Sequence, residues 1–360
     1  MRKKRILIAP LDWGLGHATR CIQIIQELLQ HNAEVVIAAD KRPAELLKKE
    51  FPNLEHRRYP GYAIQYPVNA NMAWTMFRQL PTLFKGIAEE HKLLELMVTE
   101  HEIDAVISDN RWGAYSTRVP SIFVIHQLRI LLSKYLRWGQ GIIDAANGKL
   151  MKPFTEVWIP DNSGPENLSG ELSHESLLPR NSHFIGPLSR LKRIGGMNKT
   201  LDVLVILSGP EPQRTIFETL IVEQLKQTSM RSLVVRGTPE HAVKMTLSET
   251  LTLVGSLTAD ELSEAIAASQ IIISRPGYST LMDLSFLGTN AIFVPTPQQT
   301  EQEYLATRLK EQKICYSERQ QEFLLSSAIS QFHSYSGFRQ MPQDRTVLRQ
   351  RIDTLLTTIA

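Results

Sequence analysis

Short runs of aliphatic and β-branched residues alternate along the chain with longer segments of helical hydrophobic spacing. In the first half, Arg5–Ala9 and Glu34–Ala38 are predicted strands, and apolar residues recur at helical spacing between Ala18 and Leu29. Further strands are predicted at Ile103–Ile107, Ile122–Ile125 and Glu156–Ile159. This alternation predicts an α/β fold with an open parallel sheet, in which ligands gather at the carboxyl ends of the strands.

The same alternation begins again after a polar stretch. Residues Asp161–Arg180 show little periodicity and are predicted to form a long loop, and Lys192–Asn198 is the predicted hinge. The second series comprises strands at Val203–Leu207, Ser232–Val235, Leu251–Val254 and Ile271–Ile273, a helix capped by Thr258, and helices at Gln320–Phe332 and Asp344–Ile359. We therefore expect a first domain over residues 1–190, a second over 198–340 and a terminal helix within 341–360.

The composition is that of a globular protein and argues against several other classes of protein. The chain has 360 residues, 42% hydrophobic and 21% charged, which is typical of a globular protein that buries sizeable cores. A net charge of +3 gives no reason to expect nucleic acid as a partner. Cys21 and Cys315 fall in different predicted domains, which argues against a disulfide framework and favours the cytoplasm. The apolar run after the basic N-terminus stops at Asp12, too early for a signal peptide, and no run is long enough to cross a bilayer.

One stretch combines a strand, a turn and a helix start. The strand Ile271–Ile273 is broken by a proline and Gly277, and either Ser279 or Thr280 can cap a new helix with Asp283 in or near its first turn. Free N–H groups and the helix dipole make such a start an anion site. A carboxylate one turn into the helix can accept hydrogen bonds from both hydroxyls of a ribose.

This stretch resembles the donor-nucleotide signature of GT-B glycosyltransferases, and it is most similar to the bacterial family that adds N-acetylglucosamine to lipid-linked peptidoglycan precursors. The resemblance implies two Rossmann-like α/β domains facing a cleft, with the last helix returning to the first domain. It also implies that Asp283, an Asp where that family has Glu, holds the ribose of a nucleotide-sugar. The matching residues are Arg275, Gly277, Asp283, Pro295, Gln302 and Tyr304.

The same resemblance assigns the remaining donor contacts. The turn of Gly277, Tyr278, Ser279 and Thr280 would hold the pyrophosphate, and Gln302 and Glu303 the sugar, although Glu303 stands where that family has a second Gln. Two further loops resemble family loops: Ser208–Thr215, with Gly209 and Arg214 near the diphosphate, and Leu253–Leu257, with Gly255, Ser256 and Leu257 near a uracil base. Pro210 and Pro212 donate no N–H, so the first of these loops is a poorer phosphate cradle than a Gly-Gly-Ser version.

The loop after the first strand, Gly14-Leu15-Gly16-His17, has three interpretations. It is a dinucleotide fingerprint with Asp40 as the ribose acid, a plain turn between strand and helix, or the glycine-rich loop that it resembles in GT-B enzymes. In the last case Gly14 and Gly16 border the acceptor and His17 faces the cleft. A neutral imidazole is suited to take a proton from an attacking hydroxyl near neutral pH.

Polar residues also end the strand Ile103–Ile107. Asp109 would orient His17 or act as the base itself, and Arg111 would bind an anionic acceptor group, unless the two form an ion pair that holds the loop. His126, at the end of the next strand, is a weaker acceptor-site candidate of the same kind, or else a buried hydrogen-bonded histidine.

Two segments are apolar and basic together: Met72–Leu83 and Leu128–Trp138. They are core helices with snorkelling cations, or a basic amphipathic surface that contacts a membrane. A lipid-linked acceptor would require the second arrangement at the inner face of the membrane.

Together with these features, the resemblance implies an inverting glycosyltransferase of cell-envelope glycan synthesis. An acceptor hydroxyl, on a glycan or a lipid-linked saccharide, would displace the diphosphate of a UDP-sugar such as UDP-N-acetylglucosamine, with Arg275 or Arg214 adding charge at the leaving group. The chain has no Asp-x-Asp pattern, so we expect neither a metal nor another cofactor. The alternatives are a UDP-sugar 2-epimerase and a nucleotide-sugar-binding subunit without turnover.

Overall fold

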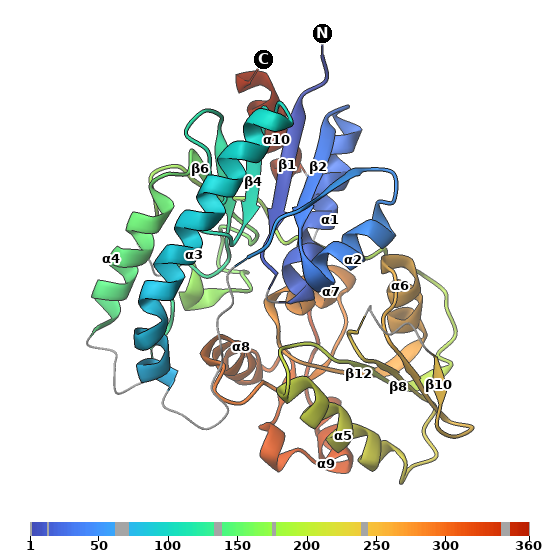
Figure 1. The fold of residues 1–360 in the computed structure, drawn as a ribbon. Coiled ribbons are helices and arrows are strands. Elements are labelled where there is room, and N and C mark those ends of the chain that lie inside the picture. The colour runs from blue at the N-terminus through green and yellow to red at the C-terminus, as the bar shows by residue number, and fades with distance from the viewer. Residues whose placement is uncertain are drawn as a thin grey trace.

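The chain folds into two stacked α/β halves, each built on its own sheet (Figure 1). The structure is a computed structural model. It describes residues 2–12, 14–61, 72–132, 139–174, 178–238, 244–339 and 346–359, and within α3 the side chains only from residue 81 onward. Residues 175–177 of the predicted loop Asp161–Arg180 and residues 133–138 of the predicted segment Leu128–Trp138 lie outside these ranges, whereas the predicted hinge Lys192–Asn198 is described in full.

The first half is a seven-stranded sheet in the order β3-β2-β1-β4-β5-β6-β7, and all its strand pairs are parallel. Its strands are β1 Arg5–Pro10, β2 Glu34–Ala39, β3 Glu55–Arg58, β4 Ala105–Asp109, β5 Ser121–Val124, β6 Glu156–Ile159 and β7 Ser182–Phe184. Its helices are α1 Leu15–Gln30, α2 Lys41–Glu50, α3 Met72–Glu100, α4 Gln140–Met151 and the 3₁₀ turn η2 Gly170–Leu172.

The second half repeats the plan in the order β10-β11-β9-β8-β12-β13-β14, with only the β10–β11 pair antiparallel among the pairs described. Its strands are β8 Leu201–Ile206, β9 Ser232–Val235, β10 Met245–Thr246, β11 Leu251–Val254, β12 Ser269–Ser274, β13 Ile292–Phe293 and β14 Tyr316–Ser317. The helices are α5 Gln213–Leu225, α6 Ala259–Ala268, α7 Tyr278–Leu287, α8 Thr300–Glu311, η3 Gln320–Glu322, α9 Leu325–Phe332 and α10 Thr346–Thr358.

The predicted strands and the parallel α/β class are confirmed, and two predicted helix boundaries are wrong. The helix expected over Gln320–Phe332 is split, because Phe323 and Leu324 have extended backbone between η3 and α9. Helix α7 begins at Tyr278 with Gly277 as its N-cap, so neither Ser279 nor Thr280 caps it. Asp283 consequently lies in the second turn of α7.

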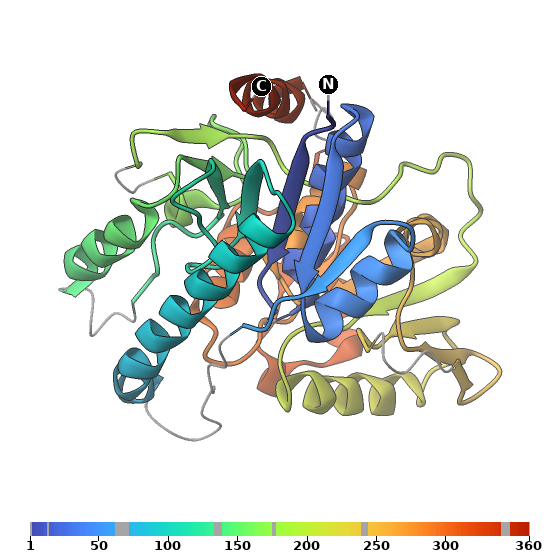
Figure 2. The ribbon, with the colours of Figure 1, turned by 45° about the horizontal axis from the view of Figure 1, so that its top comes forward.

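The two halves share an apolar core where α1 meets α7. Ile22 and Ile25 of α1 belong to the same buried cluster as Leu281 and Met282 of α7. The terminal helix α10 lies against α1, beside the N-terminus and away from the second sheet (Figure 2). Its Leu348, Ile352 and Leu355 join the same cluster, and its Arg349 Nε donates to Glu27 Oε1 of α1 at 2.8 Å.

Candidate active site at the junction of the two halves

The first turns of α1 and α7 touch. The hydroxyl of Ser279 donates to the carbonyl oxygen of Gly16 at 2.8 Å, and a Cβ placed on Gly16 would lie 3.0 Å from that hydroxyl. Gly14, the N-cap of α1, has open space where a Cβ would stand. The hydroxyl of Tyr278 donates across the junction to Pro160 at 3.1 Å. The predicted acceptor loop and the predicted pyrophosphate turn are therefore neighbours.

His17 and Asp109 form a hydrogen-bonded pair at this junction. His17 is in the first turn of α1 and Asp109 ends β4, the strand beside β1, which brings His17 Nδ1 within 2.6 Å of Asp109 Oδ1. Asp109 is fully buried, whereas His17 keeps 18% of its side chain exposed. The sequence predicted that these residues would act together, and the structure brings them together.

Arg20 is a member of the site that sequence reasoning missed. It lies one turn after His17, is buried, and donates to both carboxylate oxygens of Asp109. Burial and the charge of Arg20 hold the pKa of His17 below its ordinary value, although Asp109 opposes this shift. Burial would raise the pKa of Asp109, but Arg20 and His17 outweigh it and lower that pKa. The pair is therefore a carboxylate and a neutral imidazole over a wide range of pH.

His126 continues the network into the second half. Its ring stacks on Tyr278 with the centroids 4.1 Å apart, and its Nε2 lies 3.0 Å from Glu301 Oε1 in the first turn of α8. The buried, hydrogen-bonded interpretation of His126 is confirmed, and His126 is not free to bind an acceptor through Nε2. Glu301 was missed, because the family signature directed attention to its neighbours Gln302 and Glu303.

Asp283 faces the segment that connects the two sheets. Its Oδ1 accepts the hydroxyl of Ser189 at 2.6 Å, and the thioether of the preceding residue, Met282, accepts from the N–H of Leu188 at 3.2 Å. Burial raises the pKa of Asp283 to about 6. The ribose acid predicted from the family signature is thus a half-buried carboxyl with a protein partner next to the interdomain connection.

Arg275 is a buried structural residue, contrary to the expectation that it adds charge at a diphosphate. It is fully buried, and its guanidinium lies over the ring of Phe217 with its carbon 4.3 Å from the ring centroid. Its donors hold the segment after β13, through the carbonyls of Val294 and Pro295, and the start of α5, through the carbonyl of Gln213. Burial lowers its pKa to about 9.

The other two predicted anion-binding arginines also have acidic partners. Arg214 is buried and paired with Glu211 and Glu218, so its charge is neutralised within α5 and the preceding turn. Arg111 pairs with Glu90 of α3, not with Asp109, and donates to the carbonyls of Tyr59 and Pro60 at 2.8 Å. In both residues the guanidinium donors are used in folding the loops, so the geometry gives no support to the expectation of direct ligand binding.

The loops at the carboxyl edge of the second sheet converge. The N–H of Thr238 donates to Gly255 at 2.8 Å, which places the Gly255–Leu257 segment next to β9. Gly209 has a φ of 104°, and a Cβ there would lie 3.6 Å from the Thr296 hydroxyl. The hydroxyl oxygens of Thr238 and Thr296 are buried and have no hydrogen-bond partner within the part of the chain that the structure describes. They are candidate ligand contacts that the sequence analysis did not single out.

Helix α8 is tied to the same edge by its first turn. The Oε1 of Gln302 accepts from the N–H of Thr296 at 2.9 Å, and the Oε1 of Glu303 accepts from the N–H of Gln298 at 3.0 Å.

Asp40, the acid of the dinucleotide interpretation, accepts from Arg58 Nε at 3.1 Å. Among the described residues no group of three or more His, Cys, Asp or Glu side chains is arranged to hold a metal ion.

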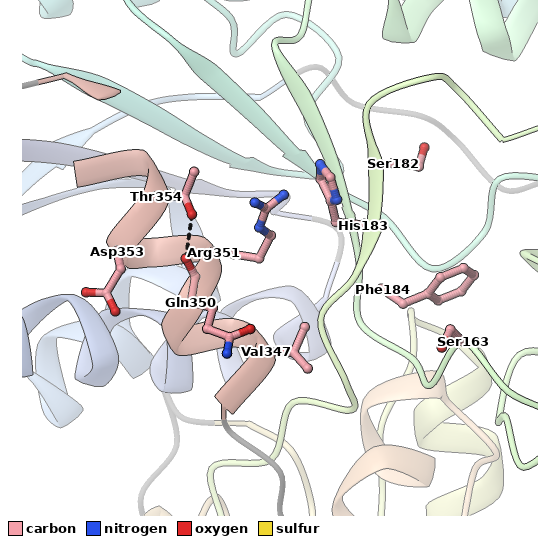
Figure 3. A pocket seen from close by; sticks show the side chains of 9 residues that line it. All are labelled: Ser163, Ser182, His183, Phe184, Val347, Gln350, Arg351, Asp353 and Thr354. Atoms are coloured by element: carbon pink, nitrogen blue, oxygen red, sulfur yellow. Dashed lines mark hydrogen bonds between the residues drawn. The ribbon is translucent and has the colours of Figure 1, made fainter. Parts of the chain in front are cut away.

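A separate open pocket lies between β7 and α10, away from these residues (Figure 3). His183 and Phe184 of β7 and Val347 and Arg351 of α10 are among the residues that line it. No residue of the junction site lines this pocket.

No helix in the described ranges is both long and apolar enough to span a bilayer.

Two Rossmann-like halves whose strand ends meet at one junction make a GT-B architecture, and comparison with known proteins identifies the chain as a glycosyltransferase. Residues 213–345 match the C-terminal domain of glycosyltransferase family 28. The chain is 32% identical over 322 residues to the UDP-N-acetylglucosamine–N-acetylmuramyl-(pentapeptide) pyrophosphoryl-undecaprenol N-acetylglucosamine transferase of Pasteurella multocida, covering 84% of this chain and 80% of that one. The chain therefore belongs to glycosyltransferase family 28, which confirms the resemblance inferred from the sequence.

Two solved structures show the same fold. MurG of Acinetobacter baumannii aligns over 99% of both chains with a TM-score of 0.55 and 14% identity. A putative UDP-N-acetylglucosamine 2-epimerase from Listeria monocytogenes aligns over 99% of this chain and 97% of that one, with a TM-score of 0.62 and 12% identity. At such identities the likeness establishes the architecture alone.

Proposed function

We propose that this glycosyltransferase moves a sugar from a UDP-linked donor to a hydroxyl of a glycan or lipid-linked acceptor, with inversion and without a metal. The observation that carries the proposal is the His17–Asp109 pair, 2.6 Å apart, whose His17 follows Gly16, the residue that contacts Ser279 in the first turn of α7. The donor class and the lipid-linked acceptor are supported by the name of the Pasteurella relative.

The chemistry follows from the proton positions. Asp109 accepts the Nδ1 proton of His17, so the Nε2 lone pair can take the proton of an acceptor hydroxyl while its oxygen attacks the anomeric carbon. The bond from that carbon to the diphosphate breaks, and the electron pair leaves with UDP, which inverts the anomeric centre in one displacement. Asp109 stabilises the imidazolium that forms.

The donor contacts proposed for the second half come from α7 and the loops around it. The N–H groups at the start of α7, from Gly277 to Thr280, would meet the diphosphate, and the helix dipole would stabilise its developing charge. Asp283 would exchange its Ser189 partner for the ribose hydroxyls. Gln302 and Glu303 would meet the sugar, and Leu253–Leu257 the uracil. The hydroxyls of Thr238 and Thr296, which have no hydrogen-bond partner among the described residues, fit a polar ligand at this edge.

A membrane contact through α3 and α4 is part of the proposal. The two helices project side by side at one end of the first half in both ribbon views (Figures 1 and 2). Phe84 of α3 and Ile142 of α4 are 55% and 68% exposed, and Lys85 and Lys149 add positive charge nearby in the sequence. An apolar surface with flanking cations suits an anionic bilayer. Co-sedimentation with phosphatidylglycerol vesicles should fall in Phe84→Ser/Ile142→Ser, and unchanged binding would contradict this contact.

The first experiment is thermal unfolding in the presence of nucleotides. UDP should raise the melting temperature by mass action, and Asp283→Ala should abolish that rise, whereas Asp260→Ala, an exposed acid on α6, should retain it. Stabilisation by NAD that is lost in Asp40→Ala would instead support a dinucleotide site.

A second experiment measures release of UDP with UDP-N-acetylglucosamine as donor. Release only when a lipid-linked muramyl-peptide acceptor is added would distinguish transfer from epimerisation and from binding without turnover.

A further inference from the structure

A continuous chain of hydrogen bonds links the second half of the molecule to the His17–Asp109 pair. Its far end is Glu301 in the first turn of α8, whose Oε1 lies 3.0 Å from His126 Nε2. His126 Nδ1 lies 2.8 Å from Arg20 Nη1, and Arg20 donates to both oxygens of Asp109. Only Glu301 comes from the second half, and it keeps 18% of its side chain exposed.

The chemistry of the partners fixes the protons along this chain. A guanidinium only donates, so His126 Nδ1 accepts from Arg20, and the ring proton lies on Nε2, which donates to Glu301. His17 Nδ1 lies 2.6 Å from Asp109 Oδ1 and 3.0 Å from Arg20 Nη2, and because the carboxylate is the nearer partner and only accepts, His17 donates from Nδ1 to Asp109. Each ring therefore has one tautomer, and the tautomer of His17 is the one that leaves Nε2 able to take a proton.

We propose that Glu301, His126 and Arg20 are positioning residues for the base His17, so that the base is complete only when α8 of the second half lies against the first half. The role of His17 as a base rests on the proposed function, but the linkage is a property of the free protein. Glu301 is adjacent to Gln302 and Glu303, so the turn of α8 that is assigned to the donor sugar also holds the base. The ring stack of His126 on Tyr278 ties α7 to the same assembly.

Opposing charges act on His17 through this chain. Arg20 disfavours protonation of the ring, and the carboxylates of Asp109 and Glu301 favour it. Burial would raise the pKa of Glu301, but His126, His17 and Arg20 lower it, so Glu301 is charged and interacts with His17. The titratable and charged groups that face this site among the described residues are Arg20 and Cys21 of α1, Asp109 of β4, His126 after β5 and Glu301 of α8.

The linkage can be tested without any substrate by ¹⁵N NMR titration of the full-length, histidine-labelled protein. His17 is assigned by the signals that disappear in His17→Gln. Its titration midpoint should fall in Glu301→Gln, because a favourable negative charge is lost, and should rise in Arg20→Gln, because an unfavourable positive charge is lost. Glu301→Asp keeps the charge and should shift the midpoint less than Glu301→Gln. Glu311→Gln, an exposed acid near the end of the same helix, should leave it unchanged.

Two results would overturn the proposal: an unchanged His17 midpoint in Glu301→Gln, or shifts of the same sign in Glu301→Gln and Arg20→Gln. If Arg20→Gln does not fold, the Gln and Asp variants of Glu301 test the proposal by themselves, because Glu301 is the partly exposed end of the hydrogen-bond chain. Midpoints that shift as expected in a protein without transferase activity would uphold the linkage and refute the proposed function, so the two failures are distinguishable.

Discussion

Ser279 and Gly16, which are 263 residues apart in the sequence, are joined by a hydrogen bond of 2.8 Å between the first turns of α7 and α1. Each residue belongs to a loop that the sequence assigned to a different ligand, the donor diphosphate and the acceptor. The contact therefore brings the two candidate ligand sites to one junction, next to His17, which follows Gly16 in α1.

Removal of this hydrogen bond should weaken the junction. Ser279→Ala is expected to lower the free energy of unfolding by about 1 kcal/mol, the usual net contribution of one hydrogen bond. Urea unfolding without ligand measures it. Ser330→Ala is the matched control, because that hydroxyl is exposed and bonds only within α9, to Ser327. An equal loss in both variants would show that the bond between the halves contributes nothing of its own.

The carboxyl of Asp283 should make stability depend on pH. Its pKa is raised from 3.8 to about 6 in the folded protein, so folding favours the protonated form. Its contribution is fully present below pH 3.8 and is lost as the pH rises through about 6. Asp283→Asn, which cannot ionise, should therefore gain stability relative to wild type between pH 4.5 and pH 7.5 in urea unfolding. A constant difference between the two proteins across that range would be inconsistent with the raised pKa.

Turnover should persist in mildly acidic solution. The base must be neutral to accept a proton, and the pKa of His17 lies below 6.5 because burial and Arg20 disfavour its charged form. The acid limb of kcat/KM against pH should accordingly lie below the pKa of a free imidazole.

His17→Gln should lower kcat by about 10²- to 10⁴-fold, the range of general-base contributions, and retain UDP stabilisation. Normal turnover in His17→Gln would exclude His17 as the base.

The start of α6 offers a stability test that is remote from the site. Thr258 accepts from the N–H of Glu261, and Glu261 accepts from the N–H of Thr258 at 2.7 Å, which completes a capping box. Thr258→Ala should cost about 1 kcal/mol, and Thr354→Ala, on the exposed face of α10, should cost less. Thermal unfolding checks both, and UDP should stabilise both variants as it does wild type.

Local pattern was sufficient for most of the fold. Apolar runs marked the buried strands, whereas β3, with the sequence Glu-His-Arg-Arg, and the two-residue strands β10 and β14 gave no such signal. The start of α7 was misplaced because serine and threonine are the usual caps, but here Gly277 has the extended backbone of an N-cap.

The candidate site was predictable in part. His17 and Asp109 follow strands, and their position at a sheet edge is a consequence of topology. Arg20 and Glu301 have partners that are 89 and 175 residues away, and no local pattern identifies such pairs. Arg275 and Arg111 had the charge expected of ligand-binding residues, but both are fully buried and their donors hold backbone carbonyls.

The position of α10 has a consequence for the order in which the protein is made. Residues 346–358 are synthesised after the whole second half, yet Leu348, Ile352 and Leu355 fill the core beside α1. A nascent chain that carries both sheets but not α10 still has an uncovered apolar surface on α1, the first helix to be synthesised. A chain truncated before α10 should therefore leave this surface of α1 open to aggregation and proteolysis.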